Sequence, residues 1–344
     1  MKKDVRRLKI AILFVAFVSM MILMHGILSE AIAQKGPLRL TTAATSVGSP
    51  PYVIVSNFAE AAKRGLPPGS SINVESSGTT ANAARIGEGE LDFGYVNMID
   101  VALAIKGKPP FTKKLGKIRI LCGLTPPEAE EYLFMVGKDT GLNSIDEIKQ
   151  KRFPLTLALP MKGSGSELLT RMVLDAYGIA YEDITSWGGK VIFTSFAEQR
   201  ALFKDKRVQA VGSILPYPHP GYVEIFTFRK DVLFLPIDKE EAIKKLKEDG
   251  IIQIIIKKGH YGIADRDTPT IASPSFLGVR ADLPDEVVYS LLKGAIENID
   301  ILQKSHRAMK DFTLESAYKF VAPFTNIVSF HPAAEKYFKE KLRH

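Results

Sequence analysis

The sequence of 344 residues contains one cysteine, Cys122, so it cannot form an internal disulfide or a cluster of thiolate metal ligands. Stability must therefore come from a packed core. Hydrophobic residues make up 46% of the chain, which is ordinary for a globular protein. A chain of this length buries most of its apolar surface in one large or two medium domains.

Sequence motifs for nucleotide cofactors and metals are also missing. There is no G-x-x-x-x-G-K-[ST], and no G-x-G-x-x-G opens a helix after the first predicted strand, so no cofactor is expected. The histidines are scattered without H-x-x-H or H-E-x-x-H spacing, so neither a metal site nor a catalytic constellation is predicted. One enzyme class stays open, because Gly163-Ser164-Gly165-Ser166-Glu167 is a truncated form of the G-x-S-x-G elbow of serine hydrolases.

Residues 1–33 have the organisation of a cleavable signal peptide. Cations crowd the first nine residues, an apolar run extends from Ile10 to about Leu28, and Ala31-Ile32-Ala33 follows as an A-x-A cleavage site. We therefore expect an exported protein that begins near Gln34 and acts in the periplasm or another extracytoplasmic space. A retained anchor is the alternative, because the run approaches the length that spans a bilayer.

Removal of the signal lowers the positive charge of the chain. The signal carries five of the 46 basic and two of the 38 acidic residues, which leaves 41 and 36 and changes the net charge from +8 to +5. This excess is spread over the chain, without a basic block interleaved with aromatic residues. Nucleic acid is therefore not an expected partner.

From Leu38 onward, short apolar runs alternate with helical patterns, which is typical of parallel sheets flanked by helices. Two similar α/β units in series, divided at Pro126-Pro127, predict two lobes. The predicted strands are 38–42, 72–76, 93–96, 132–136, 155–159, 209–212, 232–235 and 251–256, and the predicted helices are 52–64, 81–87, 99–106, 144–150, 167–177, 195–204, 239–249, 285–302 and 333–341.

Three loops rich in glycine, serine and threonine follow predicted strands and lead into predicted helices. They are Thr45–Tyr52, Ser76–Thr80 and Lys162–Ser166. In open parallel sheets, ligands bind beyond the carboxyl ends of the strands, where helix N-termini offer free N–H groups and a partial positive charge. Such loops also simply cap helices. We expect the three loops together to converge on one small anion.

A fourth candidate segment, Ser213–Pro220, follows a predicted strand and contains three prolines. Proline fixes the backbone before a ligand arrives, which suits the edge of a preformed cleft. We place Ser213 and Pro216 among the candidate ligand contacts.

The order of these motifs resembles the solute-binding proteins of tripartite ATP-independent periplasmic (TRAP) transporters, in the TAXI branch. Thr45–Ala61 is similar to that family's T-G-S-x-G-G-x-Y-Y start, although Ser49 and Pro51 replace a glycine and a tyrosine. The passage Ser77–Gly94 is similar to T-G-G-S-x-x-N followed by G-E-A-D-L-G, and Gly163–Ser166 to a P-G-S-G-T turn. Three later segments keep the family's order, and the resemblance covers almost the whole mature chain: Asp267–Thr270, Arg280–Pro284 and Phe330–Ala334.

The resemblance implies an α/β fold of the type II periplasmic-binding-protein kind, with an interlobe cleft and crossing hinge strands. Lobe 1 is expected to comprise residues 34–130 and 236–344, and lobe 2 residues 131–235, with crossings near Ala129–Val136 and Asp231–Pro236. The C-terminal segment is expected to return to lobe 1.

The resemblance also implies a function, that of a non-enzymatic receptor for a small, anionic organic solute such as an amino acid or a carboxylate. The partners would be this solute and the membrane permease subunits of a TRAP-type transporter. In this alignment Asn97 and Met98 would face the cleft, and Lys162 would supply a countercharge. Two alternatives remain, an exported serine hydrolase that uses Ser164 or Ser166, and the binding subunit of an ABC-type or sensory system with the same fold.

The candidate ligand-binding residues are Thr45, Ser46, Gly48, Ser49, Tyr52, Ser77, Gly78, Thr79, Thr80, Asn97, Met98, Lys162, Ser164, Gly165, Ser166, Ser213 and Pro216.

Overall fold

The computed structural model describes residues 36–342, so the predicted signal peptide lies outside the described residues. Within this range, no helix has the length and apolar character needed to cross a membrane. Residues 36–38 group with residues 67–70, where the Leu38 amide donates to Ser70 Oγ at 2.9 Å. The rest of the described chain forms one compact unit that contains two β-sheets.

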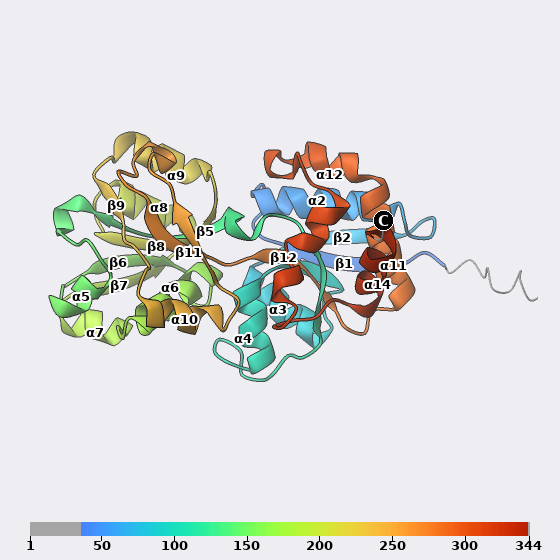
Figure 1. Ribbon diagram of the computed structural model, residues 1–344, viewed down its shortest axis with the longest axis horizontal. Helices are drawn as coiled ribbons and strands as arrows, with labels where there is room; N and C mark the ends of the chain where they lie inside the picture. The colour runs from blue at the N-terminus through green and yellow to red at the C-terminus, as the bar shows by residue number, and fades with distance from the viewer. Residues whose placement is uncertain (1–35, 343–344) are drawn as a thin grey trace, which may run out of the picture. The chain divides into compact units, whose positions relative to one another are not determined.

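The first sheet has five strands in the order β2-β1-β3-β12-β4 (Figure 1). Strands β1, β2 and β3 run parallel, and β12 lies antiparallel between β3 and β4. β3 is buried along its whole length, as expected for a central strand of a sheet covered on both faces. The strands are β1 (Arg39–Ala44), β2 (Ser71–Ser76), β3 (Phe93–Asn97), β4 (Ile118–Gly123) and β12 (Ser275–Arg280).

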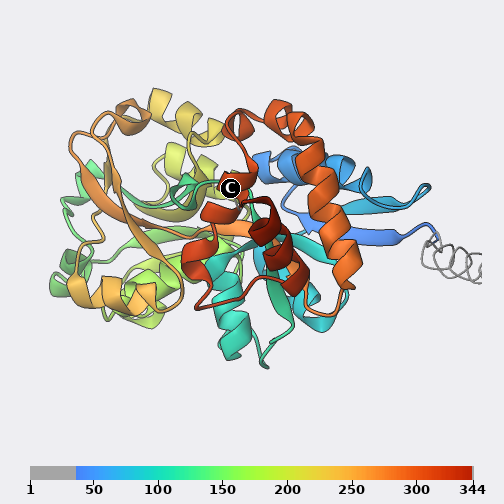
Figure 2. The ribbon, with the colours of Figure 1, turned by 45° about the vertical axis from the view of Figure 1, so that its right-hand side comes forward.

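Helices cover both faces of the first sheet. In Figure 1, α2 lies over one face of this sheet and α3 and α4 over the other. Figure 2 shows the C-terminal helix α14 beside α11. These helices are α2 (Pro50–Lys63), α3 (Thr79–Glu88), α4 (Met98–Lys106), α11 (Asp285–Glu297), α12 (Ile299–Ser305), α13 (Leu314–Lys319) and α14 (Pro332–Lys341).

Close packing of α11 on the end of α2 depends on two glycines. A Cβ on Gly65 would lie 2.1 Å from the Ser290 carbonyl oxygen, and a Cβ on Gly294 would lie 2.4 Å from the Ala62 carbonyl oxygen. Any larger residue at either position would therefore push the two segments apart.

The second sheet has the strand order β10-β11-β5-β8-β6-β7, and β9 also pairs with β5. Strands β6, β7 and β8 run parallel to one another, while β5 is antiparallel to β8 and β11. The strands are β5 (Glu130–Gly137), β6 (Thr156–Pro160), β7 (Lys190–Thr194), β8 (Ala210–Pro216), β9 (Val232–Phe234), β10 (Ile252–Ile256) and β11 (Thr268–Ala272).

Helices also flank the second sheet, with α8 and α9 on one face and α6 and α10 on the other in Figure 1. Aromatic side chains fill the core beneath α9, where the Phe226 ring lies 5.9 Å from the Tyr222 ring and 6.0 Å from the Phe234 ring. The helices are α5 (Asp146–Gln150), α6 (Gly165–Ala176), α7 (Tyr181–Ser186), α8 (Phe196–Lys204), α9 (Pro220–Phe228) and α10 (Glu240–Lys247), with the 3-10 turns η1 (Pro127–Ala129), η3 (His260–Gly262) and η5 (Ala322–Phe324).

The chain passes between the sheets twice, between β4 and β5 and between β11 and β12. The outward crossing lies near the predicted position. The return crossing is predicted near Asp231–Pro236, but in the structure it lies at Ser273-Pro274, because β10 and β11 hydrogen-bond into the second sheet. Residues 252–272, expected in lobe 1, therefore belong to the second sheet.

Two further predictions are corrected by the structure. The helix predicted over Asp285–Leu302 is divided at Asn298, whose side-chain amide donates to the Gly294 carbonyl at 2.9 Å. Asparagine side chains compete with backbone groups in this way and so interrupt helices. The segment Ser213–Pro220 is also more regular than expected, because β8 continues to Pro216 and Pro220 begins α9.

Candidate solute-binding site

The carboxyl ends of the parallel strands carry most of the predicted site residues. In the first sheet, β1 and β2 lead to Thr45 and Ser77, and β3 ends at Asn97. The two crossings lie at these carboxyl ends as well. Ser275, the first residue of β12, pairs with Asn97 at the end of β3, and Glu130, the first residue of β5, pairs with Pro216 at the end of β8. This is the position at which ligands bind in open α/β sheets.

The first loop, Thr45–Tyr52, is ordered by its own hydroxyl groups. Ser49 caps α2 and accepts a hydrogen bond from the Tyr52 amide at 3.4 Å, and its Oγ lies 2.6 Å from Thr45 Oγ1. Gly48 has a φ of +80°, which favours glycine. Ser46 and Gly48 are exposed, while Thr45, Ser49 and Tyr52 are half-buried.

The second loop meets the start of α4 through Asp100, which the sequence prediction omitted. The Thr80 hydroxyl donates to Asp100 Oδ1 at 2.6 Å, and Asp100 is fully buried. Burial raises the pKa of the Asp100 carboxyl to about 6, although hydrogen bonds from Thr80, Thr79 and the Asn97 backbone oppose this shift. The N-x-x-D spacing of Asn97 and Asp100 at a helix start is the signal that points to this residue.

The third loop lies against the same groups. A Cβ on Gly165, the first residue of α6, would lie 3.3 Å from Thr79 Oγ1, 3.4 Å from Asn97 Nδ2 and 3.8 Å from Asp100 Oδ2. Three helices, α3, α4 and α6, therefore begin around one point. We call Thr79, Thr80, Asn97, Asp100 and Gly165 the Asn97–Asp100 cluster.

Other residues of the third loop have structural partners. Ser164 caps α6, and Ser166 Oγ accepts from the Ile214 amide at 3.0 Å. The buried Glu167 carboxylate accepts from the Gly163 amide at 2.8 Å and so fixes the turn. Lys162 is exposed, with Nζ 5.9 Å from the centre of the Phe193 ring. The hydroxyls of Ser164 and Ser166 are thus engaged by backbone amides and not by a histidine.

The remaining predicted residues differ in burial. Ser213 is fully buried, and its hydroxyl bonds to Gln199 Oε1 at 3.1 Å and to the Tyr222 hydroxyl at 3.0 Å, so it supports the core. Pro216 is half-buried at the end of β8. Met98 is buried behind Gly250, whose added Cβ would lie 2.4 Å from Met98 Cγ.

The structure thus brings part of the prediction together. Thr79, Thr80, Asn97 and Gly165 share the cluster, whereas Lys162 contacts Phe193 and the hydroxyls of Thr45 and Ser49 contact each other. Ser77 and Gly78 precede the cluster in the second loop. Their role in ligand binding stays a prediction.

Buried polar groups also occupy the crossings, and the sequence prediction did not include them. The Tyr95 hydroxyl lies 2.8 Å from Glu130 Oε1 and 2.7 Å from Ser275 Oγ. Burial raises the pKa of the Glu130 carboxyl to about 7, with a further increase from the Glu131 charge. Next to it, Glu131 Oε1 lies 2.8 Å from His260 Nε2.

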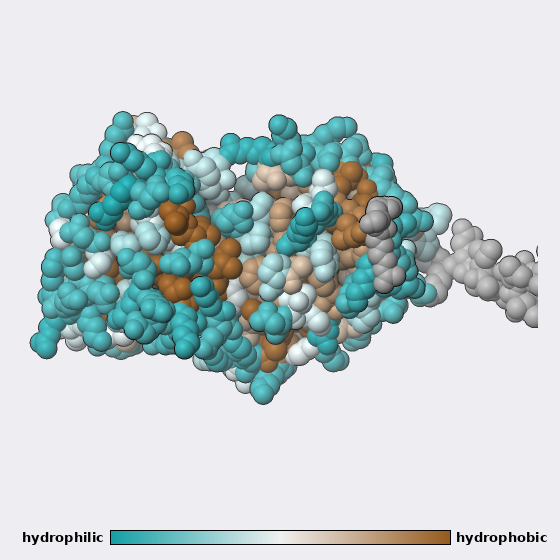
Figure 3. All heavy atoms as spheres, in the orientation of Figure 1, coloured by the Kyte–Doolittle hydropathy of each residue, from teal (hydrophilic) through white to brown (hydrophobic). Residues whose placement is uncertain are grey.

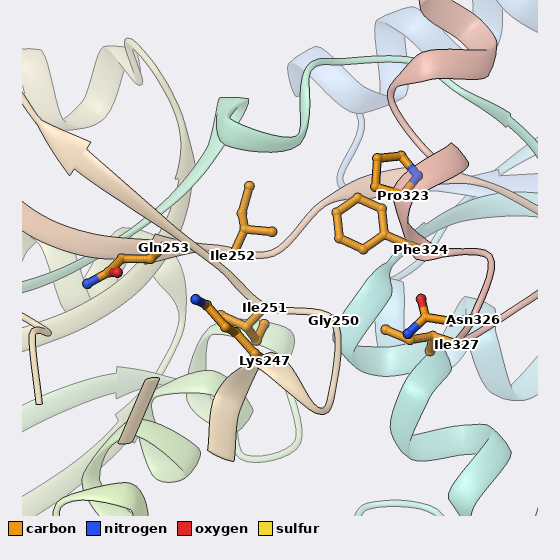
Figure 4. Close-up of a pocket in the computed structure, with 9 residues that line it drawn as sticks. All are labelled: Lys247, Gly250, Ile251, Ile252, Gln253, Pro323, Phe324, Asn326 and Ile327. Carbon is orange, nitrogen blue, oxygen red and sulfur yellow. The ribbon is translucent and has the colours of Figure 1, made fainter. Parts of the chain in front are cut away.

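A pocket of about 470 Å³ is lined by none of the predicted site residues, although Met98 lies directly behind one of its lining residues, Gly250 (Figure 4). It is bounded on one side by the turn that enters β10 and on the other by η5 and the residues after it. Its lining residues are Lys247, Gly250, Ile251, Ile252, Gln253, Pro323, Phe324, Asn326 and Ile327. We place the candidate site at the strand ends, because the pocket lacks their convergent helix starts and buried polar groups.

Two sheets flanked by helices and joined by two crossings form the fold of the two-lobed periplasmic binding proteins. The chain is similar in structure to PhnD1 from Prochlorococcus marinus in complex with methylphosphonate, with 15% identity and a TM-score of 0.52 over 85% of this chain and 97% of that one. It is also similar to a binding-protein component of a phosphonate ABC transporter from Pseudomonas aeruginosa, with 12% identity and a TM-score of 0.51 over 89% and 96% of the two chains. At these identities the likeness establishes the fold.

The sequence itself matches a family. Residues 42–341 match the NMT1-like family, and the chain therefore belongs to this family.

Proposed function

We propose that this protein is an exported receptor that binds a small anionic organic solute, an amino acid or a carboxylate, between its two lobes and delivers it to a membrane permease. The convergence of α3, α4 and α6 at the Asn97–Asp100 cluster is the observation that carries this proposal. Helix N-termini present unpaired N–H groups and a partial positive charge, which together bind anions. The fold and the NMT1-like family agree with a receptor and give no support to an enzyme.

Ligand screening tests the proposal directly. Thermal unfolding of the purified protein should be followed with panels of amino acids, dicarboxylates, keto acids and phosphonates. A solute that binds only the folded state stabilises it by about 2.7 kcal/mol at a concentration of 100 times Kd. The melting temperature therefore rises. If no small anion raises the melting temperature of the folded protein, the proposal fails.

The permease partner divides the proposal into two forms. The resemblance of the motifs to the TAXI branch favours a TRAP-type permease, which is ATP-independent. The relative from Pseudomonas aeruginosa is named as part of an ABC phosphonate transporter, which favours an ATP-driven permease. Uptake of the identified solute by cells depleted of ATP separates the two, since only the TRAP form predicts that uptake continues.

Export belongs to the same proposal. The receptor must lie outside the cytoplasm to meet its solute, and residues 1–33 would direct it there. N-terminal sequencing of the exported protein should give a sequence that begins near Gln34. A mature protein that starts at Met1 would instead support a retained anchor.

The serine hydrolase alternative has a weaker basis. Ser164 and Ser166 are engaged with the amides of Glu167 and Ile214 at 3.3 and 3.0 Å. The protein should not turn over an esterase substrate, and a serine-reactive probe should leave both serines unlabelled. Labelling of either serine would support the hydrolase alternative.

A further inference from the structure

Tyr217, the residue that follows β8, is held in place and yet open to solvent. Its ring stacks on the His260 ring with 3.8 Å between the centroids, and it meets the Tyr261 ring edge to face at 5.0 Å. The Tyr217 amide donates to the Ala129 carbonyl at 3.3 Å. Tyr217 nevertheless remains 51% exposed, so these contacts fix the ring without placing it in the core.

The two rings that hold Tyr217 are themselves fixed by hydrogen bonds. His260 Nε2 lies 2.8 Å from Oε1 of the buried Glu131. The Tyr261 hydroxyl accepts from the His219 amide at 2.9 Å. An aromatic ring that is ordered before a ligand arrives loses little conformational entropy on binding. Tyr217 therefore offers a preformed apolar contact surface to a molecule in the solvent.

The Asn97–Asp100 cluster and the Tyr217 ring flank the same two crossings. Asn97 pairs with Ser275 at the start of β12, and Glu130 at the start of β5 pairs with the last residue of β8. The Tyr95 hydroxyl joins the two starts, because it lies 2.8 Å from Glu130 Oε1 and 2.7 Å from Ser275 Oγ. The cluster and the ring thus belong to one region, in which a solute between the lobes can contact both.

Exposed apolar side chains also follow other strands at these carboxyl ends. Met161, directly after β6, is 67% exposed, and Val47, in the loop after β1, is 71% exposed. Phe196 begins α8 after β7 and is 43% exposed. Single apolar residues on a surface are ordinary, but several at the position of a ligand site indicate a ligand with an apolar part. A solute without such a part would leave these side chains facing water.

We propose that the solute carries an aromatic ring beside its anionic group, and that this ring stacks on Tyr217 while the anionic group lies at the helix starts of the Asn97–Asp100 cluster. The inference rests on the proposed function and narrows its ligand class to aromatic acids. A ring is favoured over an alkyl chain, because two aromatic rings attract each other beyond the effect of the apolar area that they bury. Tyr217 is then a residue that determines specificity.

Calorimetric titration with matched pairs of acids tests this inference. Phenylacetate is compared with cyclohexylacetate, and phenylphosphonate with cyclohexylphosphonate, because the members of each pair are similar in size and differ in the aromatic character of the ring. The unaltered protein should bind the aromatic member of at least one pair about threefold to tenfold more tightly, which is the scale of aromatic stacking. Equal binding of both members of each pair overturns the assignment.

Substitution of Tyr217 locates the effect. Tyr217→Phe keeps the ring and should keep the preference, whereas Tyr217→Leu keeps an apolar side chain without a ring and should abolish it. Because Tyr217 is exposed, neither variant removes a buried side chain from the core. Phe228→Leu is the matched control, since Phe228 is 75% exposed and lies at the far end of α9. This variant should leave the preference unchanged.

The outcomes separate this inference from the proposed function. If other small anions bind and neither aromatic acid does, the ring assignment fails and the receptor stands. A preference for the aromatic member that survives Tyr217→Leu overturns the assignment in the same way. If no anion binds the folded protein, aromatic or otherwise, the receptor and the ring assignment fail together.

Discussion

Two buried amides, Asn82 and Gln199, hold the strand ends in the same way in the two sheets. Asn82 Nδ2 on α3 lies 3.3 Å from the Ala44 carbonyl oxygen of β1 and 2.9 Å from that of Tyr95 on β3. Gln199 Nε2 on α8 lies 3.0 Å from the carbonyl oxygen of Ala158 on β6 and 3.2 Å from that of Gly212 on β8. Each amide bonds to two neighbouring strands, at or near the carboxyl ends of β1, β3 and β6 and nearer the start of β8, so it fixes the strands from which the loops leave.

Replacement of Asn82 tests this role. Asn82→Leu should lower the free energy of unfolding by about 1–3 kcal/mol, because buried carbonyl groups lose their donor. Denaturant unfolding measures the change. Asn57→Ala removes a local bond in a half-buried site, 2.8 Å from Nδ2 to the Val53 carbonyl, and should cost less. Equal losses in the two variants would contradict the special role of Asn82.

Lys162 provides a second test at the level of a single residue. If its ammonium contacts the anionic group of the solute, Lys162→Ala should weaken binding about tenfold or more, and calorimetric titration gives the dissociation constant. Lys162 contacts Phe193 near the last residue of β7, whereas Lys190 is the first residue of this strand. Lys190→Ala is therefore the control. An unchanged dissociation constant for Lys162→Ala would remove this lysine from the site.

Single residues of the cluster were partly predictable from the sequence. Gly, Ser and Thr after a strand identify helix starts, and Thr79, Thr80 and Gly165 follow from that pattern alone. Asp100 has a local signal, the N-x-x-D spacing with Asn97, but its hydrogen bond to Thr80 joins the starts of the successive helices α3 and α4 and is not visible in the sequence.

Tyr95 lies in a predicted strand, whereas Glu130 precedes one and pairs in sequence with Glu131, a pattern that usually indicates a solvated surface. The structure instead buries Glu130, and no local pattern shows that its carboxylate meets the Tyr95 hydroxyl at 2.8 Å.

At the scale of elements, the first residue of β5 links stability to pH. The pKa of Glu130 is raised to about 7 in the folded protein, above the value of about 4.3 for an unfolded chain. The folded state therefore binds this proton more tightly. Its contribution to stability is complete below the unfolded pKa and is lost as the pH rises through the folded pKa.

Glu130→Gln should accordingly flatten the fall in stability between pH 5 and pH 8, by on the order of 2 kcal/mol. Thermal unfolding of wild type and variant across this range gives the difference, which separates Glu130 from Asp100 and Glu131, whose pKa values are also raised. Glu128→Gln changes an exposed acid in the same crossing and should leave the profile unaltered. Parallel curves for Glu130→Gln and wild type would disprove the linkage.

The outer strand β10 exposes apolar surface. It forms one edge of the second sheet, and Ile255 is 53% exposed. Figure 3 shows where apolar residues reach the surface on one face of the molecule. Edge strands of this composition pair readily with other chains.

Ile255→Lys should therefore reduce concentration-dependent self-association, which light scattering after size-exclusion chromatography measures. Gln253 is exposed two residues earlier on the same face of β10, so Gln253→Lys adds the same charge without removing an apolar side chain. If both variants behave alike, charge and not the apolar edge controls association.

At the scale of the whole molecule, the alternation of strands and helices predicted two α/β units and placed the outward crossing. The return crossing could not be located in this way, because β11 pairs with β5 across more than a hundred residues and β10 in turn pairs with β11. Strand pairing of this range leaves no periodic signal in the local sequence. Asn298 similarly ends α11 within a continuous amphipathic pattern.

The antiparallel pairing of β4 with β12 makes the second sheet an insert. Gly123 and Phe276 are register partners, although everything from β5 to β11 lies between them in the sequence. A short hairpin can therefore splice β4 directly to β12 and leave all five strands of the first sheet in order. Recombination at this junction can exchange the second sheet and its helices for another insert while the first sheet keeps its strand order.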